Sequence, residues 1–168
     1  EIKDLLSYMR LVMNNDDNVS LRRIINSPPR GIGASTIAKI EQEAKKQGHS
    51  MFRTMKLMLK SQNFAASFKE KIGEFVQLID KLSHVQHKTA SDMLKDVIER
   101  SEYLTELEDE RIQNVLELVA SADGISVREF LDHAALFSST DQLQGAKGVS
   151  LLTLHSAKGL EFPTVFIV

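Results

Sequence analysis

Apolar residues recur at helical spacing along almost the whole chain, and no other feature of the sequence limits the fold as strongly. In residues 1–14 the apolar side chains follow the i, i+3, i+4, i+7 order of a helix with one buried face. The same pattern predicts helices over residues 20–26, 34–48, 50–60, 64–86, 89–101, 108–124 and 126–138. The expected fold class is therefore mainly α.

Residues that commonly cap helices support several of these boundaries. Ser20, Ser50, Thr89 and Ser126 stand at helix starts, where a side-chain oxygen can accept a hydrogen bond from a free backbone N–H group. Gly48 stands at a helix end, where a left-handed backbone conformation favours glycine. These five residues are the predicted caps.

The C-terminal segment departs from the helical pattern. Residues 149–154 and 164–168 are short, β-branched and bounded by Gly or Pro, which predicts two buried strands around the polar loop HSAKGLEFP. Residues 138–148 are polar and are expected to form a loop. A two-stranded element is rarely stable alone, because its edges expose unpaired backbone groups. The helical body is therefore expected to be an insertion into an α/β host domain, with fragments of that host at both ends.

Composition narrows the class of protein. The chain has 168 residues, enough for one domain with a real core. It contains no cysteine, so neither a disulfide framework nor a thiolate metal site is expected. No apolar run reaches the length that spans a membrane. Because the first residue is Glu1 rather than Met, we expect a piece of a longer protein.

Charge is unevenly distributed along the chain. The net charge of −2 argues against a generally basic nucleic-acid-binding protein. Residues 18–48, however, carry a net charge of +4, whereas residues 89–132 carry −8. The basic segment is compatible with a local anion-binding face. For the acidic segment a solvated helix surface is the favoured interpretation.

The stretch IINSPPRGIGASTIAKI has the layout of a helix-hairpin-helix element: a short helix, a tight turn with Gly31-Ile32-Gly33, and a second helix. Glycines allow backbone N–H groups to approach a phosphate closely, and the start of the second helix offers further N–H groups and its dipole. Arg30 and Lys39 could add positive charge. Two interpretations stay open on these residues alone: a DNA-backbone contact, or glycines that merely end one helix and begin the next.

Other candidate sites are weaker. The chain has no Walker A pattern, so the loop after residue 154 cannot hold a triphosphate alone. Asp80, His84 and His87 have possible metal-ligand spacing on one helix face, but no fourth ligand is visible and a solvated surface is favoured. Met51, Met55 and Met58 stand at helical spacing and are expected in the core or at an interface.

The two ends of the chain resemble one known family. The segment VSLLTLHSAKGLEFPTVFIV is similar to the motif V region of UvrD/PcrA/Rep-type superfamily 1 DNA helicases. EIKDLLSYMRL and SLRRIINSPPRGIG resemble the passage from domain 2A into domain 2B of these enzymes, and RIQNVLEL and FLDHAAL resemble later 2B helices. The likeness is close over residues 1–48 and 147–168 and loose between them.

The resemblance implies a domain organisation and a function. Residues 1–25 and 148–168 would be pieces of the RecA-like domain 2A, and residues 26–147 would be the helical 2B insertion. The intact protein would be an ATP-dependent 3′-to-5′ helicase and translocase of DNA repair or replication, using ATP and Mg²⁺. Domain 2B would bind the duplex backbone at the fork and regulate unwinding.

The resemblance also assigns roles to residues. The duplex contact falls on the hairpin and the helix that follows it, and we expect it at Arg30, Gly31, Ile32, Gly33, Ser35, Thr36 and Lys39. Thr153 and His155 would contact single-stranded DNA, and Glu161 would reach the nucleotide. Relatives often have Lys where Pro29 stands, and the region between residues 120 and 147 looks shorter than in relatives.

The resemblance sets further expectations for this chain alone. Walker A, Walker B and the arginine finger are absent, so we expect no catalytic residue, bound cofactor, metal or helicase activity in this chain. DNA is the expected partner, with repair or transcription proteins as further partners and no membrane. The expected location is the bacterial cytoplasm at the nucleoid. Exposed end strands would favour self-association.

Two other functions remain as alternatives. One is a free-standing helix-hairpin-helix DNA-binding module, which does not account for the C-terminal motif. The other is a helical protein-interaction or regulatory module whose contact surface would be the acidic face of residues 89–132.

Overall fold

The computed structural model describes residues 1–140 and 164–166. Residues 1–140 are mainly helical, which confirms the predicted fold class. The helices are α1 (Ile2–Met13), α2 (Asn18–Ile24), α3 (Ala34–Gln47), α4 (Met51–Lys60), α5 (Ala66–Ser83), α6 (Ala90–Ser101), the 3₁₀ helix η1 (Tyr103–Glu106), α7 (Asp109–Ser121) and α8 (Val127–Thr140).

The predicted C-terminal strands are not confirmed. Residues 149–154 and most of the polar loop at 138–148 lie outside the described residues. Residues 164–166 are neither helix nor strand, and Val165 and Phe166 are 64% and 86% exposed. At the start of the predicted loop, α8 continues to Thr140, so helix replaces loop there.

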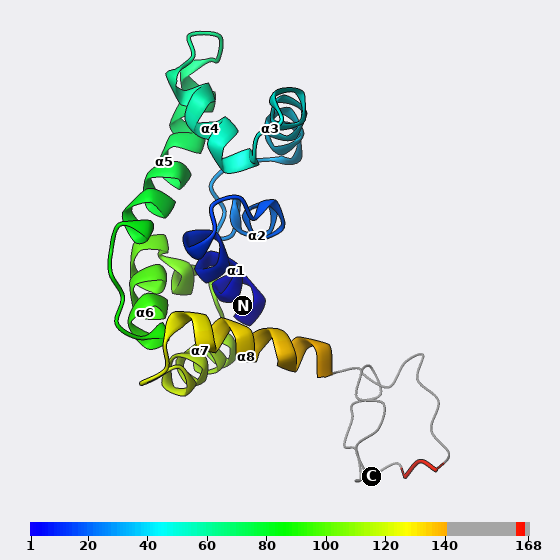
Figure 1. Cartoon of the computed structure of the whole chain (residues 1–168), viewed down its shortest axis with the longest axis vertical. Helices are drawn as coiled ribbons and strands as arrows, with labels where there is room; N and C mark the ends of the chain where they lie inside the picture. The colour runs from blue at the N-terminus through cyan, green and yellow to red at the C-terminus, as the bar shows by residue number, and fades with distance from the viewer. Residues whose placement is uncertain (141–163, 167–168) are drawn as a thin grey trace.

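Helix α1 lies at the centre of the helical body (Figure 1). It contacts α2, α5, α6, α7 and α8. Its apolar face is fully buried at Leu5, Tyr8, Met9 and Leu11, and each such side chain contributes roughly 1.5–3 kcal/mol when it leaves water. The predicted boundary at residue 25 would assign α1 and α2 to the host domain; it stays a prediction.

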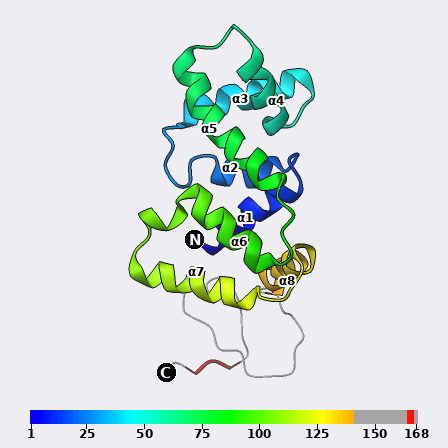
Figure 2. The ribbon, with the colours of Figure 1, turned by 90° about the vertical axis from the view of Figure 1, so that its left-hand side faces the viewer.

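Most of the other helices lie at one or the other end of the helical body, on either side of α1. Figure 2 shows α3, α4 and the start of α5 at one end and α6, α7 and α8 at the other. Helix α5 connects them, because it contacts α4 on one side and α1 and α6 on the other. Its buried residues Ile72, Phe75, Val76 and Ile79 recur at i, i+3, i+4, i+7, as the sequence pattern predicts. One long amphipathic helix thus fixes the distance between the two ends.

The methionines at helical spacing in α4 belong to the core. Met51, Met55 and Met58 are at most 2% exposed. Ile40 of α3 is fully buried and Ile37 is half-buried against the core, so α3 packs with the face that the sequence pattern predicts. Unbranched methionine side chains suit the irregular space between crossing helices.

Most predicted caps are confirmed, and one is wrong. The Ser50 side chain accepts from the N–H of Arg53, and the backbone at Gly48 is left-handed, with φ +65°. Helix α2, however, begins after Asp17 rather than at Ser20. The Asp17 carboxylate accepts from the N–H groups of Val19 and Ser20, and it also accepts from the Ser20 hydroxyl. A carboxylate that serves two N–H groups at the positive end of the helix is the stronger cap.

The cap at Thr89 is reciprocal. The Thr89 hydroxyl accepts from the N–H of Asp92, and the Asp92 carboxylate accepts from the N–H of Thr89. Ser126 caps α8 by accepting from the N–H of Glu129 at 3.3 Å. Both residues therefore cap the helices that the sequence assigned to them.

Replacing Thr89 by alanine should lower the free energy of unfolding by about 1 kcal/mol, because the α6 N–H groups lose their acceptor. Lys88→Ala is the matched control: the neighbouring side chain is exposed, so its loss should change stability by less than about 0.5 kcal/mol. Urea unfolding followed by circular dichroism measures both. Equal stability of the two variants would contradict the role of the cap.

Candidate nucleic-acid interface

The turn between α2 and α3 is held at both ends by buried isoleucines. Ile25 and Ile32 are at most 1% exposed. Between them the side chain of Asn26 organises the backbone: its Oδ1 accepts from the N–H of Arg30 at 2.8 Å and from the N–H of Ile32 at 3.0 Å. The segment therefore has a defined geometry set by one amide side chain and two apolar anchors.

The two glycines of the turn have different surroundings. Gly31 has φ +66°, a conformation that L side chains rarely adopt, and an added Cβ would lie 3.3 Å from Lys71 Nζ. Gly33 has φ −79° and is the N-terminal flanking residue of α3. An added Cβ there would meet no protein atom within 4 Å. Both glycines are exposed.

Free backbone N–H groups cluster at this turn. Within the described residues, the N–H groups of Gly31, Gly33, Ala34 and Ser35 have no hydrogen-bond acceptor. The last three stand at the start of α3, whose dipole places partial positive charge there. The turn can therefore donate hydrogen bonds to an anion.

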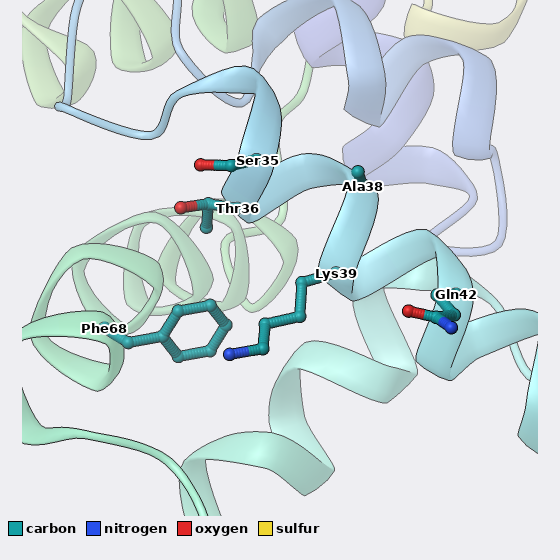
Figure 3. Close-up of a pocket in the computed structure, with 6 residues that line it drawn as sticks. All are labelled: Ser35, Thr36, Ala38, Lys39, Gln42 and Phe68. Atoms are coloured by element: carbon teal, nitrogen blue, oxygen red, sulfur yellow. The ribbon is translucent and has the colours of Figure 1, made fainter.

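Lys39 extends this surface along α3. Its ammonium lies 5.7 Å from the ring centre of Phe68 and 5.9 Å from that of Phe64. The two rings stack at 5.3 Å with an interplanar angle of 20°. Figure 3 shows Lys39 reaching toward Phe68 beside the Ser35 and Thr36 hydroxyls, in an open hollow that Ala38 and Gln42 also line.

Lys71 is a residue that sequence reasoning missed. It is exposed on α5, and its ammonium donates to the carbonyl oxygen of Gly31 at 3.2 Å. The helical pattern marks it only as a solvent-facing position, because its place beside the turn depends on how α5 packs. Phe64 and Phe68 were likewise recognisable only as apolar residues of a helix pattern.

Arg30 is engaged within the protein. Its guanidinium donates to the Tyr8 hydroxyl at 2.6 Å and to the carbonyl oxygens of Ile24 and Pro28 at 3.1 and 3.2 Å. It also lies 5.9 Å from the ring centre of Tyr8 and 5.5 Å from that of Phe75. The predicted DNA contact at Arg30 thus coincides with a half-buried side chain that already has partners.

The structure brings most of the predicted duplex-binding residues together. Gly31, Gly33, Ser35 and Lys39 are exposed at the turn and along α3, and Thr36 is half-buried beside them. The side chain of Ile32 is buried, which leaves only its backbone for contact. The three remaining predicted residues, Thr153, His155 and Glu161, lie outside the described residues.

A polar network lies beneath the turn. The Asp4 carboxylate of α1 accepts from Tyr103 Oη at 2.7 Å, from Arg23 Nε at 2.6 Å and from Ser27 Oγ at 3.2 Å. The Tyr8 hydroxyl, which accepts from Arg30, donates to the carbonyl oxygen of Ser27 at 2.7 Å. The network therefore connects α1 and η1 to the turn.

Burial and charge shift the pKa values of this network. Burial raises the pKa of Asp4, but the hydrogen bond from Tyr103 and the charge of Arg23 outweigh it, so that the net pKa is lowered. Burial raises the pKa of Tyr8 to about 12, although the Arg30 charge opposes this shift. Burial and the hydrogen bond to Asp4 raise the pKa of Tyr103 as well.

The candidate metal residues do not form a metal site in the described part of the chain. Asp80 pairs with Lys56 at 2.8 Å, and His87 contacts Asp96 at 3.0 Å. Residues 1–140 and 164–166 contain no group of three or more potential ligands placed to hold a metal ion. Among the same residues, no helix combines the length and apolarity needed to cross a membrane.

A family model and individual relatives give the same result when the chain is compared with known proteins. The family model described as the UvrD-like helicase C-terminal domain matches residues 1–168. The chain is 32% identical over 190 residues to the ATP-dependent DNA helicase PcrA of Bacillus subtilis, and 35% identical over 187 residues to DNA helicase II of Escherichia coli. Each alignment covers 100% of this chain but 26% of the relative, so the chain spans about a quarter of their length.

Alkaline pH should destabilise the fold through Tyr8. Because the pKa of Tyr8 is raised from 10.0 to about 12 by folding, the unfolded chain loses this proton first. Below pH 10 the protonated Tyr8 hydroxyl makes its full contribution to the free energy of unfolding. As the pH rises toward 12, that free energy should fall by about 2 kcal/mol. The free energy of unfolding from urea titrations at pH 9 and 11.5 measures this loss.

Tyr8→Phe is the reference for that measurement. It lacks the titrating hydroxyl but keeps every lysine and Tyr103, so the stability gap between the two proteins should narrow at the higher pH. A gap that stays constant from pH 9 to 11.5 would contradict the assignment.

Proposed function

The chain belongs to the family of UvrD-like helicase C-terminal domains, and on that premise we propose that it is the duplex-contacting part of an ATP-dependent DNA helicase. The intact enzyme would move 3′ to 5′ on DNA, with ATP and Mg²⁺ bound in parts of the protein beyond this chain. Residues 26–147 would act as the 2B domain, which grips the duplex backbone at the fork and regulates unwinding.

One observation carries this proposal: the turn between α2 and α3 presents two exposed glycines and free N–H groups beside two lysines. Gly33 leaves its surface free of side chains, so a phosphate can approach the backbone there, whereas the Lys71 side chain lies beside Gly31. Lys39 and Lys71 supply positive charge from two different helices. Such contacts bind the phosphate backbone without reading the base sequence.

The chain's overall charge does not oppose this role. The net charge is −2, but twelve of the 23 acidic residues lie at 89–132, the segment of α6, η1, α7 and the first half of α8 with their connections. Figure 2 places these helices at the end opposite α3. Exposed charges farther apart than about 8 Å are largely screened at physiological ionic strength. The local charge at the turn therefore decides whether DNA binds there.

The C-terminal residues that resemble motif V would act only in the intact enzyme. Thr153 and His155 would contact single-stranded DNA and Glu161 would reach the nucleotide, once the neighbouring ATPase domains are present. These assignments rest on the motif V likeness. Because Walker A, Walker B and the arginine finger are absent from the sequence, we expect no ATP hydrolysis by this chain alone.

Duplex binding should be weak, independent of sequence and strongly salt-dependent, with a dissociation constant of about 10⁻⁴–10⁻⁶ M at physiological salt. Fluorescence anisotropy of labelled duplex, single-stranded and tailed-duplex DNA across a salt series measures it. Gly33→Ala is the sharpest variant, because its methyl group would meet no protein atom but would stand where the DNA backbone approaches. We expect a change in stability below about 1 kcal/mol, because alanine is a poorer N-cap than glycine, and at least fivefold weaker duplex binding.

Gly31→Ala provides the comparison, since φ +66° makes that substitution strained whether or not DNA binds. It should lower both stability and affinity. Duplex binding that is unchanged by Gly33→Ala would remove the turn as the contact. Absence of duplex binding even at low salt would favour a regulatory or protein-directed role.

The two lysines should each account for about one phosphate. Lys39→Gln and Lys71→Gln should each reduce the slope of log affinity against log salt by about 0.9. Lys95→Gln is the charge-matched control, because Lys95 is exposed on α6, away from the turn. Equal slopes for all three variants would show that long-range charge, rather than contact at the turn, drives binding.

A further inference from the structure

Arg30 has the charge of a DNA ligand but the surroundings of a structural residue. Three hydrogen bonds from its two terminal nitrogens go to protein oxygens, and aromatic rings of Tyr8 and Phe75 lie within 6 Å of its guanidinium carbon. To bind a phosphate directly, the guanidinium would have to give up these contacts. Lys39 and Lys71, by contrast, are exposed.

The partners of Arg30 are the groups that determine the path of the turn. The carbonyl oxygens of Ile24 and Pro28 belong to the backbone that leads into the turn, and both accept hydrogen bonds from the same guanidinium nitrogen. The Tyr8 hydroxyl links the other terminal nitrogen to the carbonyl oxygen of Ser27. A guanidinium donates to these acceptors from two nitrogens in a fixed plane, whereas an ammonium presents its donors from a single nitrogen.

Tyr8 extends this connection into the core. It is fully buried on α1, so it cannot touch DNA. Phe75 is fully buried on α5 and lies near the same guanidinium. Arg30 therefore joins the turn to two helices of the core. In the described residues it has no carboxylate partner within ion-pair distance, which leaves its charge uncompensated beside the turn.

We propose that Arg30 is a positioning residue, which acts with Tyr8 to hold the Gly31–Gly33 turn in its phosphate-accepting shape and makes no phosphate contact itself. Its effect on the turn stands on the contacts above. Its effect on DNA affinity rests on the proposed function. Two substitutions separate positioning from charge: Arg30→Lys keeps the charge but loses the planar donor set, and Tyr8→Phe loses the acceptor while every charge stays.

The first experiment measures order in the turn without DNA. The N–H groups of Arg30 and Ile32 donate to Asn26 Oδ1, so their hydrogen exchange, followed by NMR on the full chain, reports the shape of the turn. Arg30→Lys and Tyr8→Phe should each speed exchange at Ile32 about tenfold or more relative to the buried amide of Val97 in α6. Unchanged relative exchange in both variants would overturn the proposal.

Tyr103→Phe is the matched control for that experiment. It removes a tyrosine hydroxyl that donates to Asp4 in the same network without touching Arg30. Any general loss of stability should therefore appear in Tyr103→Phe as in Tyr8→Phe, whereas faster exchange at Ile32 relative to Val97 should be confined to Tyr8→Phe and Arg30→Lys. Equal relative exchange in the two tyrosine variants would also overturn the proposal.

The second experiment measures duplex affinity across a salt series at a temperature where all variants are folded. Arg30→Lys and Tyr8→Phe should both weaken binding about three- to tenfold and leave the salt slope unchanged, because no positive charge that neutralises a phosphate is lost. A direct phosphate contact would instead leave Tyr8→Phe at wild-type affinity and lower the slope in Arg30→Gln by about 0.9. If the wild-type chain binds no duplex, the proposed function fails, and the exchange experiment still decides whether Arg30 positions the turn.

Discussion

The carboxylate of Asp4 is the point at which three distant parts of the chain meet. It accepts hydrogen bonds from Arg23 of α2, from Ser27 of the turn and from Tyr103 of η1, almost a hundred residues away. Its side chain is 16% exposed, so the ion pair with Arg23 is partly shielded from water. A shielded carboxylate with several donors is stabilised in its charged form. The helices around α1 are therefore oriented by a polar cluster as well as by apolar packing.

This arrangement explains how a solvent-facing turn can have a defined shape. A loop of small residues and prolines would ordinarily have few contacts to order it, and loops are where mobility concentrates. Here the apolar side chains of Ile25 and Ile32 fix the two ends, Asn26 organises the N–H groups between them, and Arg30 joins the turn to Tyr8. The backbone of the turn is thus ordered by folding itself, and such preorganisation would lower the cost of any contact made there.

Much of the helical fold was predictable from the sequence, because it depends on local physics. Apolar periodicity located the helices, and Ser50, Thr89 and Gly48 marked their ends, since a cap is satisfied by neighbours in sequence. Ser20 was the wrong choice for α2 for an instructive reason. Asp17 and Ser20 are both good capping residues, and the sequence does not show that the Ser20 hydroxyl is itself bonded to the Asp17 carboxylate.

The candidate site was less predictable, because its composition depends on tertiary packing. The pattern of glycines and the charge of Lys39 can be read locally, and they located the turn. That Lys71 of α5 would reach Gly31 across 40 positions, and that Arg30 would turn inward to Tyr8 across 22, follows only from how α1 and α5 cross. Residues from distant helices therefore escaped the prediction.

The two glycines of the turn stand in different backbone conformations and surroundings. Gly31 is required by the protein itself, because its φ of +66° excludes most side chains whatever lies outside. Gly33 has an ordinary backbone conformation, and open space surrounds the position where a Cβ would stand. Gly33 is also the N-cap residue of α3, where glycine is favoured over alanine, and under the proposed function close approach by a DNA backbone would be a second reason for glycine. Gly33 is thus free of the backbone strain that makes glycine necessary at Gly31.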